Sequence, residues 1–512
     1  MQTEKHSSRH GQLFIIDGDL NQIRCDALLI PTDESFVMTG KWDRSLRDGW
    51  FTRVENLVEP KWFVVKDPLE VENSYQLWFG NVGHRSPEDS EYVRVAEEFV
   101  RQAALLLRES KTSPTLALNI LGTGEGGKRN DKGHLLQLLV EQLTVTAVEL
   151  SVDVILVCFG RKQYSAARRA EQRVRRIQQS DSILDRPDIK SKVLELAELS
   201  LRNRLVHFVG AGVSSSAGLP SWQSLLNEIA KSADLAPELR SRLHELDVRD
   251  QAKILVDKIS SERYFKLLEV QLNRQHYSLL HGLIASLHPS EIVTTNYDQM
   301  LEMALGSEDQ PSILPGNPVT DNGRWLLKLH GSLDNPDSIV LTRDDYLNLP
   351  QNSGALFGIV QAMLMTKHML FTGYSLTDDS FHRVIHEVRR ARPTQSGSKI
   401  GTVFTLFEDT LFTQLWGDDL DIIHMLPTPR AEDLPEAIAI ASRELSIVLN
   451  QICRDSANPS EFLLDDTYES MLDDRELELK AILIKLKSLN DEDHLVSKYI
   501  QGLLAPISRK DK

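Results

Sequence analysis

One stretch of the chain, residues 205–222, constrains the fold more than any other. Its apolar run Leu205–Val209 is too short for a helix and is followed at once by glycine, which is typical of a buried strand. Gly210 and Gly212 then permit a tight turn and a close approach of the backbone to a ligand. Ser221 suits the start of a helix. A strand, a glycine turn and a helix N-terminus together suit a phosphate, although many Gly-Ala-Gly turns only redirect the chain.

Three later stretches repeat this design. Each is a short apolar run that ends in polar or small residues, and they span residues 292–298, 326–332 and 369–379. In doubly wound α/β sheets, ligands bind outside the carboxyl ends of the strands, where these turns are expected to lie. Four such turns in one segment favour a binding site over turns that serve only as scaffold.

Length and composition bound the remaining choices. The 512 residues are enough for two or three domains, and the net charge of −16 argues against bulk binding to nucleic acid. No apolar run is long enough to cross a membrane, and the polar start of the chain is no secretory signal. Because Cys25, Cys158 and Cys453 have no metal-ligand spacing, we predict no metal site and a reducing, cytoplasmic environment.

The first part of the chain alternates strands and helices. The runs Leu13–Ile16 and Ala27–Ile30 predict two strands paired around a turn. Further strands are predicted at 115–121 and 154–159, and helices at 97–108, 135–148 and 164–179. The first of these strands leads into Gly122–Gly127, which indicates either a second phosphate loop or a flexible bend.

The segment near residues 200 to 410 resembles the sirtuins. The motifs that carry the resemblance are Gly-Ala-Gly-Val-Ser, Gly-Leu-Pro, Thr-Asn-Tyr-Asp, Leu-His-Gly and Gly-Tyr-Ser-Leu, in the order and rough spacing of that family. It looks most like the bacterial defence-associated branch, whose members hydrolyse NAD. Ser221-Trp-Gln stands where deacylases have Asp-Phe-Arg, and Thr295 stands where they have Gln. The deacylase zinc ribbon is missing, because no cysteine lies between Cys158 and Cys453.

Two residues are the candidates for catalysis of NAD cleavage. Imidazole titrates near neutral pH, so His330 is the candidate base for a ribose hydroxyl or an attacking water. The Asn296 amide both donates and accepts hydrogen bonds and suits holding a water against the ribose carbon. His330 is alternatively a cap at the end of its strand.

The resemblance also implies residues that bind NAD as the substrate. Asp298 contacts nicotinamide in the family, and it also suits the N-cap of the helix that follows. Asp378 and Asp379 suit either the adenine ribose or a helix start. The residues expected along the pyrophosphate and the adenosine half are Gly210, Ala211, Gly212 and Ser214, followed by Gly373 and Ser375.

The first 170 or so residues are similar to a macro domain, the module known for binding ADP-ribose. The resemblance rests on Gly18-Asp19 after the first strand and on the loop Gly122–Gly127. The family's Asn-Ala-Ala-Asn is missing at the equivalent stretch Pro31–Phe36. ADP-ribose binding and a structural or assembly role therefore both stay open for this domain.

The predicted fold class is α/β, with a helical tail. We predict a macro-like α/β domain over 1–180, a linker over 181–190, a sirtuin-like Rossmann domain with an inserted helical subdomain over 191–425, and a helical C-terminal region over 426–512. Thr402–Leu406 is the predicted last strand of the Rossmann sheet. The leucine-bearing helix at 474–489 and the basic helix at 168–176 are candidate interface surfaces, although a core stripe and a solvated face are their ordinary roles.

The resemblance implies a function in antiphage defence. The chain is expected to hydrolyse NAD+ to ADP-ribose and nicotinamide. The alternatives are a sirtuin-type deacylase or ADP-ribosyltransferase, and a sensor that binds NAD or ADP-ribose without catalysis. A homo-oligomer is expected, and family members act with a partner ATPase or a phage-derived trigger, among which the sequence does not select.

The sequence predicts that zinc is neither bound nor required. No Cys or His cluster offers four ligands at workable spacing. Metal analysis of the purified protein should therefore find zinc well below one atom per chain, and a stoichiometric content would contradict this prediction.

Overall fold

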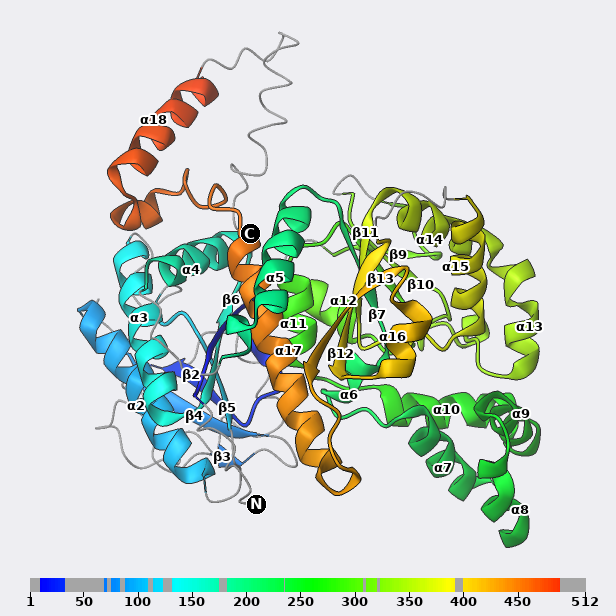
Figure 1. Ribbon diagram of the computed structural model, residues 1–512. Helices are drawn as coiled ribbons and strands as arrows, with labels where there is room; N and C mark the ends of the chain where they lie inside the picture. Colours follow the sequence, from blue (N-terminus) through cyan, green and yellow to red (C-terminus); the bar gives the residue numbers. More distant parts are fainter. Residues whose placement is uncertain are drawn as a thin grey trace, which may run out of the picture. The chain divides into compact units, whose positions relative to one another are not determined.

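The computed structural model describes residues 10–32, 69–70, 75–82, 88–108, 114–122, 131–174, 182–233, 235–306, 310–319, 323–391 and 399–488. The chain forms two compact units (Figure 1). The first comprises Met1–Asp185 with Cys453–Lys512, and the second comprises Arg186–Ile452. One boundary therefore falls inside the predicted linker, and the other falls inside the predicted C-terminal region. The limits of the functional domains stay predictions.

The first unit is built on a six-stranded sheet of order β1-β6-β5-β2-β4-β3. Only β3 runs antiparallel to its neighbour. The strands are β1 (Leu13–Asp17), β2 (Ala27–Thr32), β3 (Leu69–Glu70), β4 (Gln76–Asn81), β5 (Thr115–Asn119) and β6 (Asp153–Cys158). The helices are α2 (Asp89–Leu107), α3 (Gly133–Leu150), α4 (Arg161–Arg173) and α18 (Asp474–Ser488), with the short η1 (Leu20–Gln22) and η6 (Asp466–Met471). This mainly parallel sheet agrees with the predicted α/β class.

The predicted pairing of the first two strands is wrong. β1 pairs with β6, whereas β2 pairs with β4 and β5. Since all these pairings are parallel, β1 and β2 run in the same direction and cannot form a hairpin. The connection instead forms η1, with the Asp19 carboxylate accepting a hydrogen bond from the Asn21 amide. The predicted stretches Pro31–Phe36 and Gly122–Gly127 extend beyond the described residues.

The described part of the basic helix is not the solvated face that the sequence favoured, whereas its role in a subunit interface stays a prediction. Arg168 is fully buried, where its guanidinium contacts Glu171 at 2.8 Å and donates to the Ile15 carbonyl at 2.6 Å. Arg169 and Arg173 pair with the Glu476 carboxylate at the start of α18. Burial of a charge requires such partners, so this helix is tied into its own unit.

The second unit contains an all-parallel sheet of order β13-β12-β11-β7-β8-β10-β9. Without the short edge strand β9, this is the order 3-2-1-4-5-6 of doubly wound dinucleotide-binding sheets. The strands are β7 (Leu205–Val209), β8 (Glu291–Thr294), β9 (Ser312–Leu314), β10 (Trp325–Lys328), β11 (His368–Thr372), β12 (Gly401–Phe407) and β13 (Leu420–Leu426). The predicted Rossmann arrangement is confirmed.

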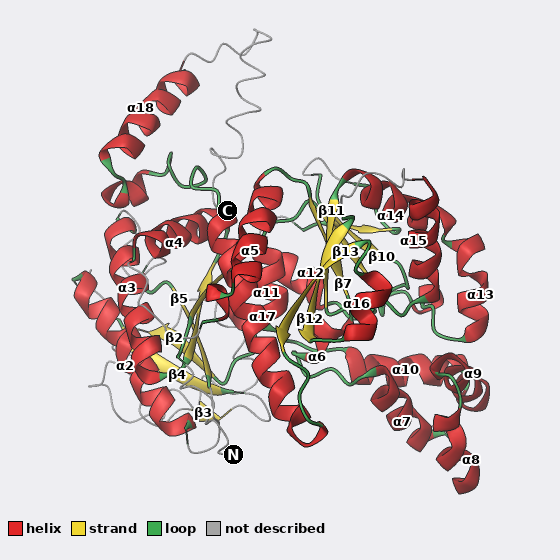
Figure 2. Ribbon diagram, in the orientation of Figure 1, coloured by secondary structure: helices red, strands yellow, loops and turns green. Residues whose placement is uncertain are grey.

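Helices surround this sheet and form an insertion after its first strand (Figure 2). The inserted helices are α7 (Trp222–Ser232), α8 (Pro237–Arg242), α9 (Val248–Ile259), α10 (Ser261–Leu272) and α11 (Leu279–Ser286), with η3 (Leu243–Glu245). The remaining helices are α5 (Pro187–Leu201), α6 (Ala211–Ser215), α12 (Met300–Leu305), α13 (Arg343–Asn352), α14 (Gly354–Thr366), α15 (Asp379–Ala391), α16 (Thr410–Trp416) and α17 (Leu434–Ser456), with η4 (Pro336–Ser338) and η5 (Ala431–Asp433). The short η2 (Ile183–Asp185) belongs to the first unit. The helical subdomain between the first two site strands is as predicted.

The predicted last strand is not the last. β12 covers Thr402–Leu406, but β13 follows it and forms the edge of the sheet. As an edge strand, β13 is paired on one side only. Its residues are partly buried and partly exposed, and Asp421 and His424 are among the partly exposed ones. Its sequence is therefore less apolar than that of a central strand.

The C-terminal segment returns to the first unit. Tyr468 and Met471 of η6 are buried in that unit's core. On α18, Leu477, Ile482 and Leu486 are exposed, so the leucine stripe is not core within this chain. The last residue of that stripe, Leu489, lies outside the described residues.

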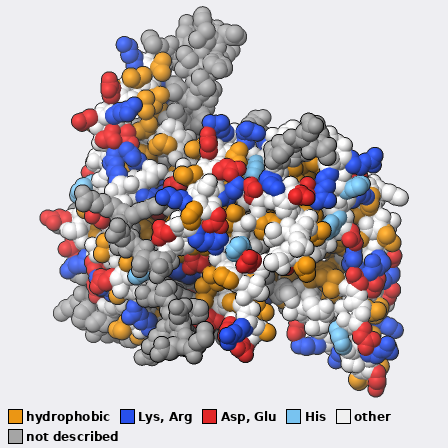
Figure 3. Space-filling model, viewed as in Figure 1, with side chains coloured by type: hydrophobic (Ala, Val, Ile, Leu, Met, Phe, Trp, Pro, Cys, Tyr) orange, Lys and Arg blue, Asp and Glu red, His pale blue; other side chains and the backbone are white. Residues whose placement is uncertain are grey.

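Two further expectations from the sequence concern the surface charge and membrane-crossing helices. On the face shown in Figure 3, Lys and Arg side chains are interspersed with Asp and Glu. Of the helices that the structure describes, none combines the length and apolar character needed to cross a bilayer.

Candidate functional site

The register of four central strands creates one edge at which the predicted turns meet. Thr372 of β11 pairs with Val209 of β7, Val209 pairs with Thr294 of β8, and Thr294 pairs with Lys328 of β10. Each of these is the last residue of its strand, so the four turns begin on one line. The chain crosses from one half of the sheet to the other between β10 and β11, which makes the β7–β11 boundary the switch point where such sheets bind ligands.

The two glycine turns at this boundary pack against each other. The Gly212 amide donates to the Gly373 carbonyl at 2.9 Å, and the Gly210 amide donates to the Thr372 carbonyl. A Cβ atom on Gly210 would lie 2.5 Å from the Gly373 carbonyl oxygen. Gly373 has a φ of +65°, and a Cβ there would lie 2.5 Å from the Val213 amide nitrogen. The structure therefore requires these glycines for contact between the turns, whatever ligand they approach.

Asn296 is held by its amide nitrogen. Its Nδ2 donates to the Gly210 carbonyl at 3.2 Å and to the Ser214 hydroxyl at 3.1 Å, and its backbone amide donates to Thr294 Oγ1. Asn296 is 6% exposed, and its Oδ1 has no hydrogen-bond partner among the described residues. A buried acceptor without a partner is costly, so its retention points to a donor supplied by a ligand or a water.

Ser214 is an internal link in this network. Its hydroxyl donates to Asp298 Oδ2 at 2.8 Å, while Asp298 Oδ1 accepts from the Met300 amide. Both carboxylate oxygens of Asp298 thus have protein partners. The N-cap of α12 (Met300–Leu305) is Gln299 and not Asp298, although the Asp298 carboxylate does accept from the first amide of that helix. The Ser214 hydroxyl also lies 3.5 Å from Nε2 of His281 in the inserted subdomain. Burial of this histidine lowers its pKa to about 4.

His330 lies in the turn after β10 and is buried against a carboxylate. Its Nε2 is 3.1 Å from Asp378 Oδ2, and the two side chains are 5% and 10% exposed. His330 Nε2 makes no hydrogen bond with a described residue, so this contact is a close approach of the two charged or polar groups. Burial alone would raise the pKa of Asp378, but the imidazole and the Ser380 amide outweigh burial and leave that pKa below its ordinary value.

Helices α9 and α13 complete the surroundings of His330. The Tyr346 ring of α13 meets the imidazole edge to face at 5.4 Å. The Arg249 guanidinium of α9 lies over Tyr346 and contacts Asp379 at 2.6 Å. Asp379 therefore binds the inserted helices, whereas its neighbour Asp378 turns toward His330.

A buried lysine joins the Asn296 turn to the strand that leads to His330. Lys328 Nζ donates to the Asp298 carbonyl at 2.7 Å and to Glu302 at 2.5 Å. Lys328 is 2% exposed, and burial raises the pKa of Glu302. Sequence reasoning missed this lysine, although a cation inside an apolar strand was a visible signal. It also missed the contact of Asp378 with His330, for which no sequence signal exists.

The remaining predicted residues lie at the same edge with fewer contacts. Ala211 begins the short helix α6 and is exposed. The exposed Ser375 shares a hydrogen bond with Thr377. Between Gly373 and Ser375, the Tyr374 ring packs inward, 4.5 Å from Phe208. The edge thus brings together all nine predicted site residues, with Ser375 the most peripheral by its contacts.

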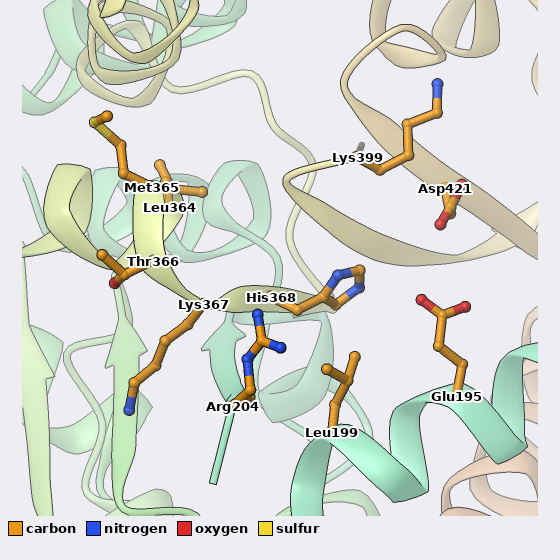
Figure 4. Close-up of a pocket in the computed structure, with 10 residues that line it drawn as sticks. All are labelled: Glu195, Leu199, Arg204, Leu364, Met365, Thr366, Lys367, His368, Lys399 and Asp421. Atoms are coloured by element: carbon orange, nitrogen blue, oxygen red, sulfur yellow. The ribbon is translucent and has the colours of Figure 1, made fainter. Parts of the chain in front are cut away.

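A separate cavity of about 350 Å³ lies at the opposite edge of the sheet (Figure 4). Arg204 just precedes β7, His368 begins β11 and Lys399 just precedes β12, so the cavity opens at the amino ends of the strands. None of the predicted site residues lines it. It is therefore distinct from the candidate site.

Comparison with known proteins finds a family match within the second unit. Residues 290–416 match the family model described as SIR2-like domain. The chain therefore carries a SIR2-like domain, and the sirtuin resemblance is confirmed.

The individual relatives are bacterial proteins. The chain is 29% identical over 216 residues to the protein named NAD(+) hydrolase ThsA from Enterococcus faecium, covering 40% of this chain and 43% of that protein. It is 26% identical over 212 residues to defense-associated sirtuin 2 from Bacillus subtilis, covering 39% of this chain and 20% of that protein. The chain thus spans less than half the length of these relatives. A solved macrodomain from Oceanobacillus iheyensis matches at 14% identity and a TM-score of 0.27, covering 33% of this chain and 95% of that one.

The packing of the glycine turns predicts a strong effect of adding one methyl group. Gly373→Ala should destabilise the second unit by roughly 2 kcal/mol or more, because the new Cβ meets backbone atoms and the φ is positive. Gly358→Ala in α14 is the matched control, since nothing lies within 4 Å of its added Cβ. Thermal unfolding followed by circular dichroism checks both, and equal melting temperatures for the two variants would contradict the packing argument.

Proposed function

We propose that this chain hydrolyses NAD+ at the nicotinamide–ribose bond, releasing ADP-ribose and nicotinamide, and that it does so in antiphage defence. The observation that carries the proposal is the unpartnered, buried Oδ1 of Asn296 at the same sheet edge as the buried His330. The names of the relatives, NAD(+) hydrolase and defense-associated sirtuin, support the choice of substrate and setting.

Cleavage of the nicotinamide–ribose bond needs little acid catalysis, but it needs stabilisation of the positive charge that develops on the ribose. Nicotinamide leaves as a neutral molecule from a cationic precursor, so the site must mainly support positive charge on the ribose and deliver water. Asn296 Oδ1 would accept a hydrogen bond from the attacking water, whose oxygen bonds to the ribose carbon as the bond to nicotinamide breaks. His330 would take the proton from that water or from a ribose hydroxyl.

The other site residues would bind the rest of the substrate. Gly210, Ala211 and Gly212 would line the pyrophosphate with backbone atoms, while Gly373 and Ser375 would approach the adenosine half. Ser214 would act by fixing Asn296 and Asp298 rather than by touching the phosphate, because its hydroxyl is already bonded to both. Asp298 would meet the nicotinamide end while it accepts from the Met300 amide.

The proposal predicts that Asn296→Ala and His330→Ala each lower NAD+ cleavage by on the order of a hundredfold or more, the usual cost of losing a base or water-positioning group. His244→Ala, an exposed histidine in the inserted subdomain, is the matched control and should keep wild-type activity. The measurement is release of free nicotinamide and ADP-ribose, with circular dichroism to confirm folding. Near wild-type cleavage by folded His330→Ala would overturn the assignment.

The same assay separates the alternatives. A deacylase would release nicotinamide only with an acylated protein, and an ADP-ribosyltransferase would leave ADP-ribose on a protein. A sensor would bind NAD+ and release neither product.

We further propose that the enzyme is an oligomer, held inactive until infection supplies a trigger. Free hydrolysis of NAD+ would harm the host cell, and moving from mostly inactive to mostly active needs roughly 5 kcal/mol of differential binding. The exposed Leu477, Ile482 and Leu486 on α18 are candidates for the subunit contact. A partner ATPase or a phage-derived protein is the candidate trigger.

This regulation predicts an assembly larger than a monomer in light-scattering measurements of the resting protein. In cells, NAD+ should fall only after phage challenge and only when His330 is present. A monomer with full activity and no toxicity would refute the switch.

A further inference from the structure

We propose that Asp378 is a positioning residue for His330, which sets the orientation of the imidazole and stabilises its protonated form during NAD+ cleavage. The inference rests on the proposed function, because it assigns a role to Asp378 in that same reaction. In this proposal the Asp378 carboxylate acts on His330, the candidate base, and does not bind the adenine ribose.

The geometry divides the two oxygens of Asp378 between two tasks. Oδ1 accepts from the Ser380 amide at 2.8 Å, which ties the carboxylate to the first turn of α15. Oδ2 is then directed at His330 Nε2 at 3.1 Å, within hydrogen-bond range. A carboxylate fixed through one oxygen in this way is a rigid reference for the ring that faces the other.

The ring of His330 is constrained on a second side by Tyr346. The edge-to-face contact, with an interplanar angle of 77°, limits rotation of the imidazole while Asp378 faces its Nε2 edge. With Nε2 directed at the carboxylate, Nδ1 points away from Asp378 and is the nitrogen left for the reacting group. A histidine base is commonly oriented by a carboxylate at its other nitrogen in this manner.

The surroundings of Asp378 make its charge effective. Three tyrosines, Tyr297, Tyr346 and Tyr374, lie near it, and burial raises the pKa of each, so all three stay neutral. The guanidinium of Arg249, which lies over Tyr346, is engaged by Asp247 and Asp379. When His330 accepts a proton, Asp378 is therefore the carboxylate in direct contact with the new positive charge, in a site where few water molecules screen it.

The decisive experiment compares Asp378→Asn with Asp257→Asn. Asparagine at 378 keeps the shape and the capping acceptor but removes the charge. We expect kcat for NAD+ cleavage to fall by on the order of a hundredfold with KM unchanged, since the base and not the ribose contact is impaired. Asp257→Asn removes one charge from the exposed side of α9, where the side chain is 57% exposed and contacts Lys253, and should keep wild-type kcat.

Two results would overturn the inference. Unchanged kcat in Asp378→Asn would remove the role altogether, and a raised KM with unchanged kcat would assign Asp378 to substrate binding. If the asparagine variant does not fold, Asp378→Ser keeps a capping oxygen without the charge and carries the same expectation.

A second readout separates this inference from the proposed function. In protein labelled with 15N-histidine, with His330→Ala used to assign the signal, the ring nitrogens of His330 should shift in Asp378→Asn and stay in place in Asp257→Asn. If the wild-type protein cleaves no NAD+, the proposed function fails while this spectrum still tests the contact. Identical His330 signals in wild type and Asp378→Asn would refute the positioning role.

Discussion

The register of four parallel strands is the constraint on which the candidate site depends. Because Thr372, Val209, Thr294 and Lys328 lie on one line, the turns that follow them emerge at the same level of the sheet. A shift of one residue in any strand would turn its side chains to the opposite face and move its turn away from the others. Residues separated by more than a hundred positions in the sequence thus meet without any direct covalent constraint.

Contacts between and within the turns then fix the positions of the site residues relative to one another. Gly210 and Gly373 permit backbone contact that any side chain would block, and Asn296 bonds to the Gly210 carbonyl. The Lys328 ammonium donates a hydrogen bond to the Asp298 carbonyl and forms an ion pair with Glu302. Within the Asn296 turn, Asn296 Oδ1 is left without a hydrogen-bond partner among the described residues, as are Thr372 Oγ1 and Ser332 Oγ in the neighbouring turns.

The adjacent acids Asp378 and Asp379 differ in burial and in the charged group that each contacts. Asp379 is exposed and pairs with Arg249 of the inserted helices, while Asp378 is buried and faces His330. The pKa of Asp378 lies below its ordinary value despite burial, so its charge persists beside the imidazole. A one-residue step at the start of α15 therefore separates a contact with the insertion from a contact with the candidate base.

The sequence by itself determined the local elements and the site motifs of the second unit. Leu205–Val209 became β7 as predicted, since an apolar run closed by glycine has few other outcomes. Periodicity is a local property, however, and strand pairing is not, which is why Leu13–Ile16 and Ala27–Ile30 were wrongly paired. The half-exposed β13 was missed for the related reason that edge strands lack a continuous apolar run. Only the tertiary structure decided that Asp378 faces His330 and that Arg168 is buried, because both follow from long-range packing, which brings together groups that no short pattern links.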